Sequence, residues 1–224
     1  MIFGDMRLFK QKGSIDWKYV SVELFLIFAG INLAIWFNNW NTSRKYEKSK
    51  TAAIERIIEE IQSNQRELML SREANLLVFE AYEILTPLYV GNSRTVAATA
   101  LQMTEIQEKY PGFFIINDTL SSNGNLIFEG DTRINLELID LSAIAWETTR
   151  FMGLTGRFDY ECLYSLESLY RLQDRVQQEI DRSADALQAG DIRRLMRILN
   201  FLKQLDVQLE RKYEETLMKI EECS

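Results

Sequence analysis

The chain has 224 residues, of which 46% are hydrophobic and 26% are charged, and its formal net charge is −7. It contains no histidine, which excludes Ser-His-Asp and Cys-His nucleophilic sites and histidine-based zinc sites. The acidic balance argues against a nucleic-acid partner, because such proteins need a basic face. We predict no enzyme activity and no catalytic, cofactor-binding or metal-binding residue.

One segment, residues 19–37, is apolar and long enough to cross a bilayer. A membrane helix needs about 20 mostly apolar residues, since each adds about 1.5 Å. In lipid the segment must satisfy its own backbone hydrogen bonds, which predicts a helix. A cleavable signal peptide is the alternative interpretation, but the bulky WFNNWN sequence that follows lacks the small residues of a cleavage site. The segment therefore predicts a retained anchor in the lipid bilayer.

Aromatic and basic residues flank this segment, as is typical of the two headgroup layers. The positive-inside rule does not decide the orientation, because four basic residues precede the segment and five follow within a comparable distance. The predicted membrane-interface residues are Trp17, Tyr19, Trp36, Trp40, Arg44 and Lys45.

Polar and small residues interrupt the segment at helical spacing. Gly30 and Ala34 form a small-xxx-small pair that would let another helix approach closely. Glu23 shares their stripe, whereas Asn32 projects from the opposite face. Glu23 either reaches the headgroups or is protonated, or it acts as a proton or ion relay. The predicted helix–helix interface in the membrane is Glu23, Gly30, Asn32 and Ala34.

The rest of the chain predicts long helices, because it contains few helix breakers. We predict an all-α protein: a tail (1–18), a transmembrane helix (19–37), a stalk with the first bundle helix (38–90) and an antiparallel helical bundle (91–224). The stalk helix should end at Pro87. Its apolar stripe consists of Ile54, Ile57, Ile58, Ile61 and Leu68. A heptad interpretation, with positions 54, 57, 61, 64 and 68 in the core and Asn64 among them, permits a short juxtamembrane coiled coil.

The predicted bundle begins with a helix from Ser93 or Thr95 to Lys109. The Asn123-Gly124 pair that follows indicates a β-hairpin, although a loop with short helical turns fits the surrounding sequence at least as well. Residues 133–151 predict the next helix. The side chains expected to face the core from it are Ile134, Leu138, Leu141, Ile144 and Ala145.

Two further helices complete the prediction. Asp159 fits the N-cap of a helix that ends near Leu187, and a short turn leads to a final helix that ends at Ile220. Cys162 on the first of these helices is predicted to be a small core residue. The two cysteines, Cys162 and Cys223, permit one disulfide without requiring it, so the redox compartment stays open.

Two segments resemble a family of bacterial single-pass membrane proteins defined by a domain of unknown function. The first is the anchor from Glu23 to Asn41, with its Gly30-Ile31 pair and its terminal Asn-Asn-Trp-Asn followed by Arg44 and Lys45. The second covers residues 145–161. The resemblance implies a bacterial inner-membrane protein with a cytoplasmic N-terminus and a periplasmic body, and it implies no activity.

Three hypotheses for function follow. The first is a non-catalytic scaffold or accessory subunit that contacts itself or other membrane-protein subunits in a homo-oligomer or a larger complex. The second is an ion-coupled or force-transmitting subunit that uses Glu23. The third is a membrane-anchored sensor whose helical body binds a ligand.

Overall fold

The computed structural model describes residues 17–91, 94–122 and 125–220, together with Cys223. The chain divides into two compact units, residues 1–49 and residues 50–224. The described part of the first unit is helical throughout and belongs to helix α1 (Trp17–Leu85), which continues into the second unit. The start of the predicted tail, residues 1–16, lies outside the described residues.

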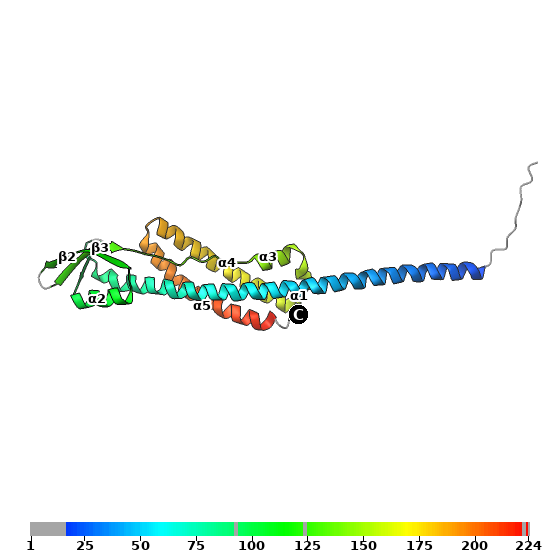
Figure 1. Ribbon diagram of the computed structural model, residues 1–224. Coiled ribbons are helices and arrows are strands. Elements are labelled where there is room, and N and C mark those ends of the chain that lie inside the picture. The colour runs from blue at the N-terminus through cyan, green and yellow to red at the C-terminus, as the bar shows by residue number, and fades with distance from the viewer. Residues whose placement is uncertain (1–16, 92–93, 123–124, 221–222, 224) are drawn as a thin grey trace, which may run out of the picture. The chain divides into compact units, whose positions relative to one another are not determined.

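Five α-helices dominate the described residues, so the predicted helical architecture is confirmed (Figure 1). After α1, which ends just before Pro87, come the 3₁₀ helix η1 (Thr86–Leu88), strand β1 (Thr95–Ala98) and α2 (Ala100–Lys109). Strands β2 (Phe114–Ser122) and β3 (Asn125–Thr132) follow. The remaining elements are α3 (Ile144–Phe151), η2 (Leu154–Arg157), α4 (Tyr160–Gln188) and α5 (Ile192–Ile220).

Part of α1, with α4 and α5, forms the main core of the second unit. Glu60 contacts Tyr170 and Asn64 contacts Gln173, so α1 and α4 run in the same direction. Helix α5 returns antiparallel after a turn at Ala189 and Gly190, and the predicted N-cap Asp159 is confirmed by its 2.8 Å bond from the Cys162 amide. The α1 residues that face this core are Ile54, Ile57, Ile61, Asn64 and Leu68. The structure thus places this stripe in the bundle rather than in a juxtamembrane coiled coil.

A small antiparallel sheet in the order β1-β3-β2 forms a second core with α2 and the end of α1. The hairpin indicated by Asn123-Gly124 is confirmed in β2 and β3, and the alternative of a loop with helical turns is wrong; the two turn residues lie outside the described ranges. Gly130 lies beneath Phe114, and a Cβ there would come within 2.2 Å of the Ile115 carbonyl oxygen. Only glycine fits that close approach.

The helix predicted from Ser93 or Thr95 begins later than expected. Thr95–Ala98 pairs with β3 instead, with Val96 and Ala98 buried. Thr99 then caps α2 through a reciprocal capping box with Gln102. The box supplies the N-terminal signal that fixes the helix start, and the predicted end at Lys109 is correct.

The predicted helix 133–151 is wrong over its first half, because only Ile144–Phe151 is helical. Residues 133–143 instead run extended along α1, with Glu137 beside Asn75 and Ser142 beside Asn64. From residue 75 to residue 64, α1 rises about 16 Å. Five extended residue steps cover about 17 Å, whereas five helical steps would cover about 7.5 Å. Of the expected core residues, Leu141 is buried, but Leu138 is 44% and Ile144 is 72% exposed.

Candidate functional sites

The apolar segment of the first unit forms one exposed helical surface. The structure contains one helix long and apolar enough to cross a membrane, and none of its most apolar window is buried by the described chain. The helix of a soluble core would be covered by its own protein, whereas the described chain leaves this surface uncovered. The coarse prediction of an N-terminal helix suited to a bilayer therefore agrees with the structure.

Three of the predicted membrane-interface residues, Trp36, Trp40 and Arg44, form a cluster on α1. Trp36 and Trp40 stack with ring centroids 6.2 Å apart, and the Arg44 guanidinium lies 4.4 Å from the centroid of a Trp40 ring. Trp17 and Tyr19 begin the helix at its other end, and both are exposed. Lys45 is exposed beside the cluster. A stacked indole pair under a cation suits a headgroup layer, which is apolar on one side and charged on the other.

The predicted helix–helix residues Glu23, Gly30, Asn32 and Ala34 are all exposed on α1. A Cβ at Gly30 would meet no atom within 4 Å, so a second helix could approach its backbone there. The side-chain amide of Asn32 donates to the Phe28 carbonyl at 2.8 Å. This internal bond lowers the cost of an amide in lipid, and it leaves the side-chain oxygen and the second N–H of Asn32 available to a neighbouring helix.

A ladder of side-chain amides holds the extended segment 133–143 against the helices. Asn64 both accepts from the Ser142 amide (3.0 Å) and donates to its carbonyl (2.7 Å), and Asn75 does the same at Glu137 (2.9 and 3.0 Å). Gln177 accepts from Leu141 at 2.9 Å, and Gln173 donates to the Ser142 carbonyl at 2.9 Å. These bonds satisfy backbone groups of an extended segment that pairs with no strand among the described residues.

Glu60 forms the polar centre below this ladder. Its carboxylate accepts bonds from the Tyr170 hydroxyl (2.7 Å), the Ser142 hydroxyl (2.8 Å) and the Ala145 amide (2.8 Å). The last contact places a negative charge at the start of α3, where the helix dipole favours it. Tyr170 also stacks on buried Trp146, with ring centroids 5.5 Å apart. Burial, then the nearby Glu60 charge, raises the pKa of Tyr170, so its hydroxyl stays protonated and donates.

A buried carboxyl group lies farther along the same interface. Asp206 on α5 is 8% exposed and lines a cavity of about 30 Å³ with Ser71 and Arg72. Burial, with a smaller effect from the like charge of Glu210, raises the pKa of Asp206 to about 6 even though Arg72 opposes the shift. Arg72 itself pairs with Glu210 at 2.6 Å.

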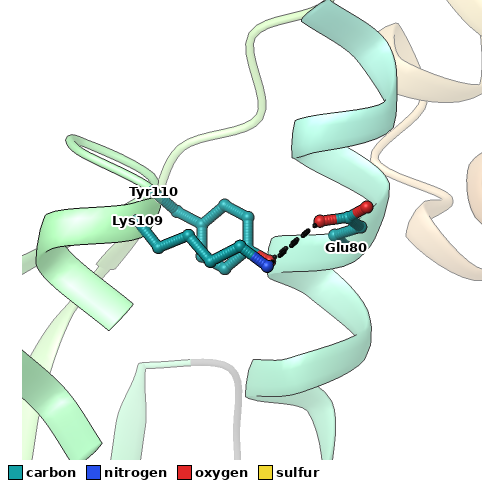
Figure 2. A network of polar contacts seen from close by, with 3 residues as sticks. All are labelled: Glu80, Lys109 and Tyr110. Atoms are coloured by element: carbon teal, nitrogen blue, oxygen red, sulfur yellow. Dashed lines mark hydrogen bonds and ion pairs between the residues drawn. The ribbon is translucent and has the colours of Figure 1, made fainter. Parts of the chain in front are cut away.

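A third polar network joins α2 to α1, as Figure 2 shows. The Tyr110 hydroxyl donates to Glu80 at 3.1 Å, and the Lys109 ammonium lies 3.4 Å from the same carboxylate. These contacts, led by the Tyr110 hydrogen bond, hold the pKa of Glu80 below its usual value. The network fixes the end of α2 against the outer side of α1.

Cys162 and Cys223 form a disulfide between the first turn of α4 and the residues after α5. Both cysteines are buried, as expected for Cys162. Asp159 lies within 4.8 Å of both sulfur atoms. Oxidised sulfur is not a thiolate ligand, so the group offers a metal ion only one carboxylate.

No buried side-chain nitrogen or oxygen among the described residues lacks a hydrogen-bond partner, and the Glu60 cluster and the amide ladder bond within the chain. The chain was compared with protein-family models, curated proteins and solved structures, and none of the three comparisons finds a match. The ladder could not be predicted from the sequence, because Asn64 and Asn75 on α1 lie far along the chain from Gln173 and Gln177 on α4. The one local signal is that Asn64 and Gln173 each interrupt a buried, mostly apolar helix face.

Proposed function

We propose that the chain is a single-pass membrane protein whose helical body acts as a non-catalytic scaffold or accessory subunit, in a homo-oligomer or a larger inner-membrane complex. The observation that carries this proposal is the membrane-length apolar helix that no described part of the chain covers. The helix also continues without a break to Leu85, through the position where a signal peptide would be cut.

The disulfide supports an orientation that the basic residues leave undecided. Disulfides persist in oxidising compartments and are rare in the cytosol. A body with a Cys162–Cys223 bond therefore fits the periplasm, which leaves the N-terminal tail in the cytoplasm. This orientation agrees with the resemblance to bacterial inner-membrane proteins.

We propose that the protein acts through helix–helix contacts rather than through a catalytic reaction. Glycine and alanine on the membrane helix permit close helix contacts, and the buried polar groups of the body are engaged internally. Lipid-facing helices associate through such packing and through interhelical hydrogen bonds. Protein–protein contact is therefore the function that these residues support best.

The test has two steps. After cell lysis the full chain should stay with the membranes through an alkaline carbonate wash and should leave them only in detergent. In mild detergent, Gly30→Leu and Asn32→Leu should reduce the size of the assembly. Ile31→Leu is the matched control, because it lies about 100° from both positions on the helix. Recovery of the chain in the aqueous fraction would overturn the anchor, and unchanged size for both variants would overturn assembly through this helix.

A further inference from the structure

A groove of about 720 Å³ lies beside α1 within the second unit. Its apolar lining comes from Leu77, Val78 and Ala81 on α1 and from Phe113 and Ile134 in two later segments. Leu77 is 49% exposed there. Small-molecule sites are pockets of about 300–1,000 Å³ with mostly apolar walls and a few polar groups. The groove therefore has the size and the lining of such a site.

Hydrogen bonds fix the walls of the groove to one another. The Arg133 amide donates to the Phe113 carbonyl at 2.7 Å, which joins the two segments that lie opposite α1. The first of these segments is held on α1 by the 3.1 Å bond from the Tyr110 hydroxyl to Glu80 (Figure 2). The second continues into residues 133–143, which the amide ladder holds against the same helix. Walls that are already fixed lower the entropy cost of binding a ligand.

One positive charge on the rim of the groove is left uncompensated. The lining contains two cations, Lys109 and Arg133, and no carboxylate. Lys109 is paired with Glu80 at 3.4 Å. Arg133 is exposed and forms no ion pair within the described ranges. It acts at longer range on Asp131, but Arg94 already binds that carboxylate at 3.0 Å. The guanidinium of Arg133 thus stands beside an apolar groove, on a chain whose net charge is −7.

We propose that this groove binds a long-chain carboxylate, with its alkyl chain along α1 and its carboxylate on Arg133. A guanidinium donates two parallel N–H bonds to a carboxylate, which is planar and singly charged. A phosphate monoester would bring close to two negative charges to a site with one uncompensated cation. The alkyl chain would cover Leu77 and Val78 and so remove apolar surface from water. The inference goes beyond the proposed function and does not depend on it.

Photo-crosslinking of the full-length chain in native membranes tests the site. The probe is palmitate with a diazirine in its alkyl chain. Trypsin releases residues 73–94 as one peptide, because Arg72 and Arg94 are consecutive basic residues. This peptide carries the α1 side of the groove and should be labelled. Residues 213–219 carry Met218, which is 67% exposed outside the groove, and they measure non-specific labelling.

Variants at the rim and in the lining separate the two parts of the ligand. Arg133→Gln should raise the probe concentration for half-maximal labelling about tenfold or more, because it removes charge-assisted hydrogen bonds. Arg193→Gln removes another exposed arginine, on α5, and should leave this concentration unchanged. Leu77→Asn should also weaken labelling, because it makes the lining polar. All three variants should keep the melting temperature of the wild type without probe.

Competition identifies the head group. Excess unlabelled palmitate should abolish the label on residues 73–94, whereas hexadecanol, which has the same chain without the charge, should compete about tenfold less well. Equal competition by the alcohol, or an unchanged half-maximal concentration for Arg133→Gln, would overturn the proposal. Labelling of residues 73–94 at only the level of residues 213–219 would also overturn it. Hexadecyl phosphate that competes better than palmitate would refute a carboxylate as the ligand.

Discussion

The side chain of Asn64 makes two hydrogen bonds to the backbone of Ser142, 78 residues away in the chain. Its oxygen accepts from the Ser142 amide at 3.0 Å, and its nitrogen donates to the Ser142 carbonyl at 2.7 Å. Asn64 is 1% exposed and also bonds Gln173. One buried amide therefore joins α1, α4 and the extended segment.

Replacing Asn64 with alanine should destabilise the body strongly. The change leaves the Ser142 amide without its acceptor, and a buried group in that position costs about 1–3 kcal/mol. It also removes a second bond from the Ser142 carbonyl, which keeps Gln173, and from the Gln173 oxygen, which keeps Tyr213. We expect a loss of about 3 kcal/mol in the free energy of unfolding, measured by denaturant titration of the full chain in detergent. Asn75→Ala removes the same paired geometry at a more exposed position, so its loss should be clearly smaller. Equal losses would contradict the role of burial.

Asp206→Asn should stabilise the body at neutral pH. The folded pKa of about 6 lies above the usual aspartate value of 3.8, so the folded state binds the proton more tightly than the unfolded state. The stability that this proton provides is present below pH 4 and is lost as pH rises through 6. The difference between these two pKa values corresponds to about 3 kcal/mol in the free energy of unfolding. Melting curves should show a gain for the variant at pH 7.5 that vanishes near pH 4, and a gain independent of pH would refute the explanation.

Gly130→Ala should disrupt the sheet. Its Cβ would lie 2.2 Å from the Ile115 carbonyl oxygen and 2.7 Å from the Phe114 ring, both in β2. Backbone must move to relieve the first clash, so we expect a loss of at least about 2 kcal/mol. Gly156→Ala is the control, because its Cβ would meet no atom within 4 Å. Thermal unfolding by circular dichroism measures both.

Removing the disulfide should lower stability and report the compartment. Cys162 and Cys223 enclose a separation of 61 residues, for which the chain-entropy model gives about 4 kcal/mol. A paired Cys162→Ser and Cys223→Ser variant should therefore unfold at lower denaturant concentration. In cells, a thiol-reactive polymer should shift the wild-type band only after reduction. A shift without reductant would place the body in a reducing compartment.

The long helices, including the apolar N-terminal one, could be predicted because their signals are local. The 19–37 run, the Asp159 cap and the Pro87 stop each act within a few residues. The extended conformation of segment 133–143 could not be predicted. Ile134, Leu138 and Leu141 have helical spacing, but the chain there must bridge about 16 Å along α1, which requires an extended backbone. Only the fold reveals that distance. The Glu60 cluster likewise joins residues more than 80 positions apart.

The extended segment also has a kinetic signature. The amide protons of Glu137, Leu141 and Ser142 are held by the side chains of Asn75, Gln177 and Asn64 rather than by a neighbouring strand. The rate at which these protons exchange with deuterium should therefore depend on the separation of α1 from α4, and not on the opening of a β-sheet. The exchange rates of these three protons therefore report how stably α1 packs against α4.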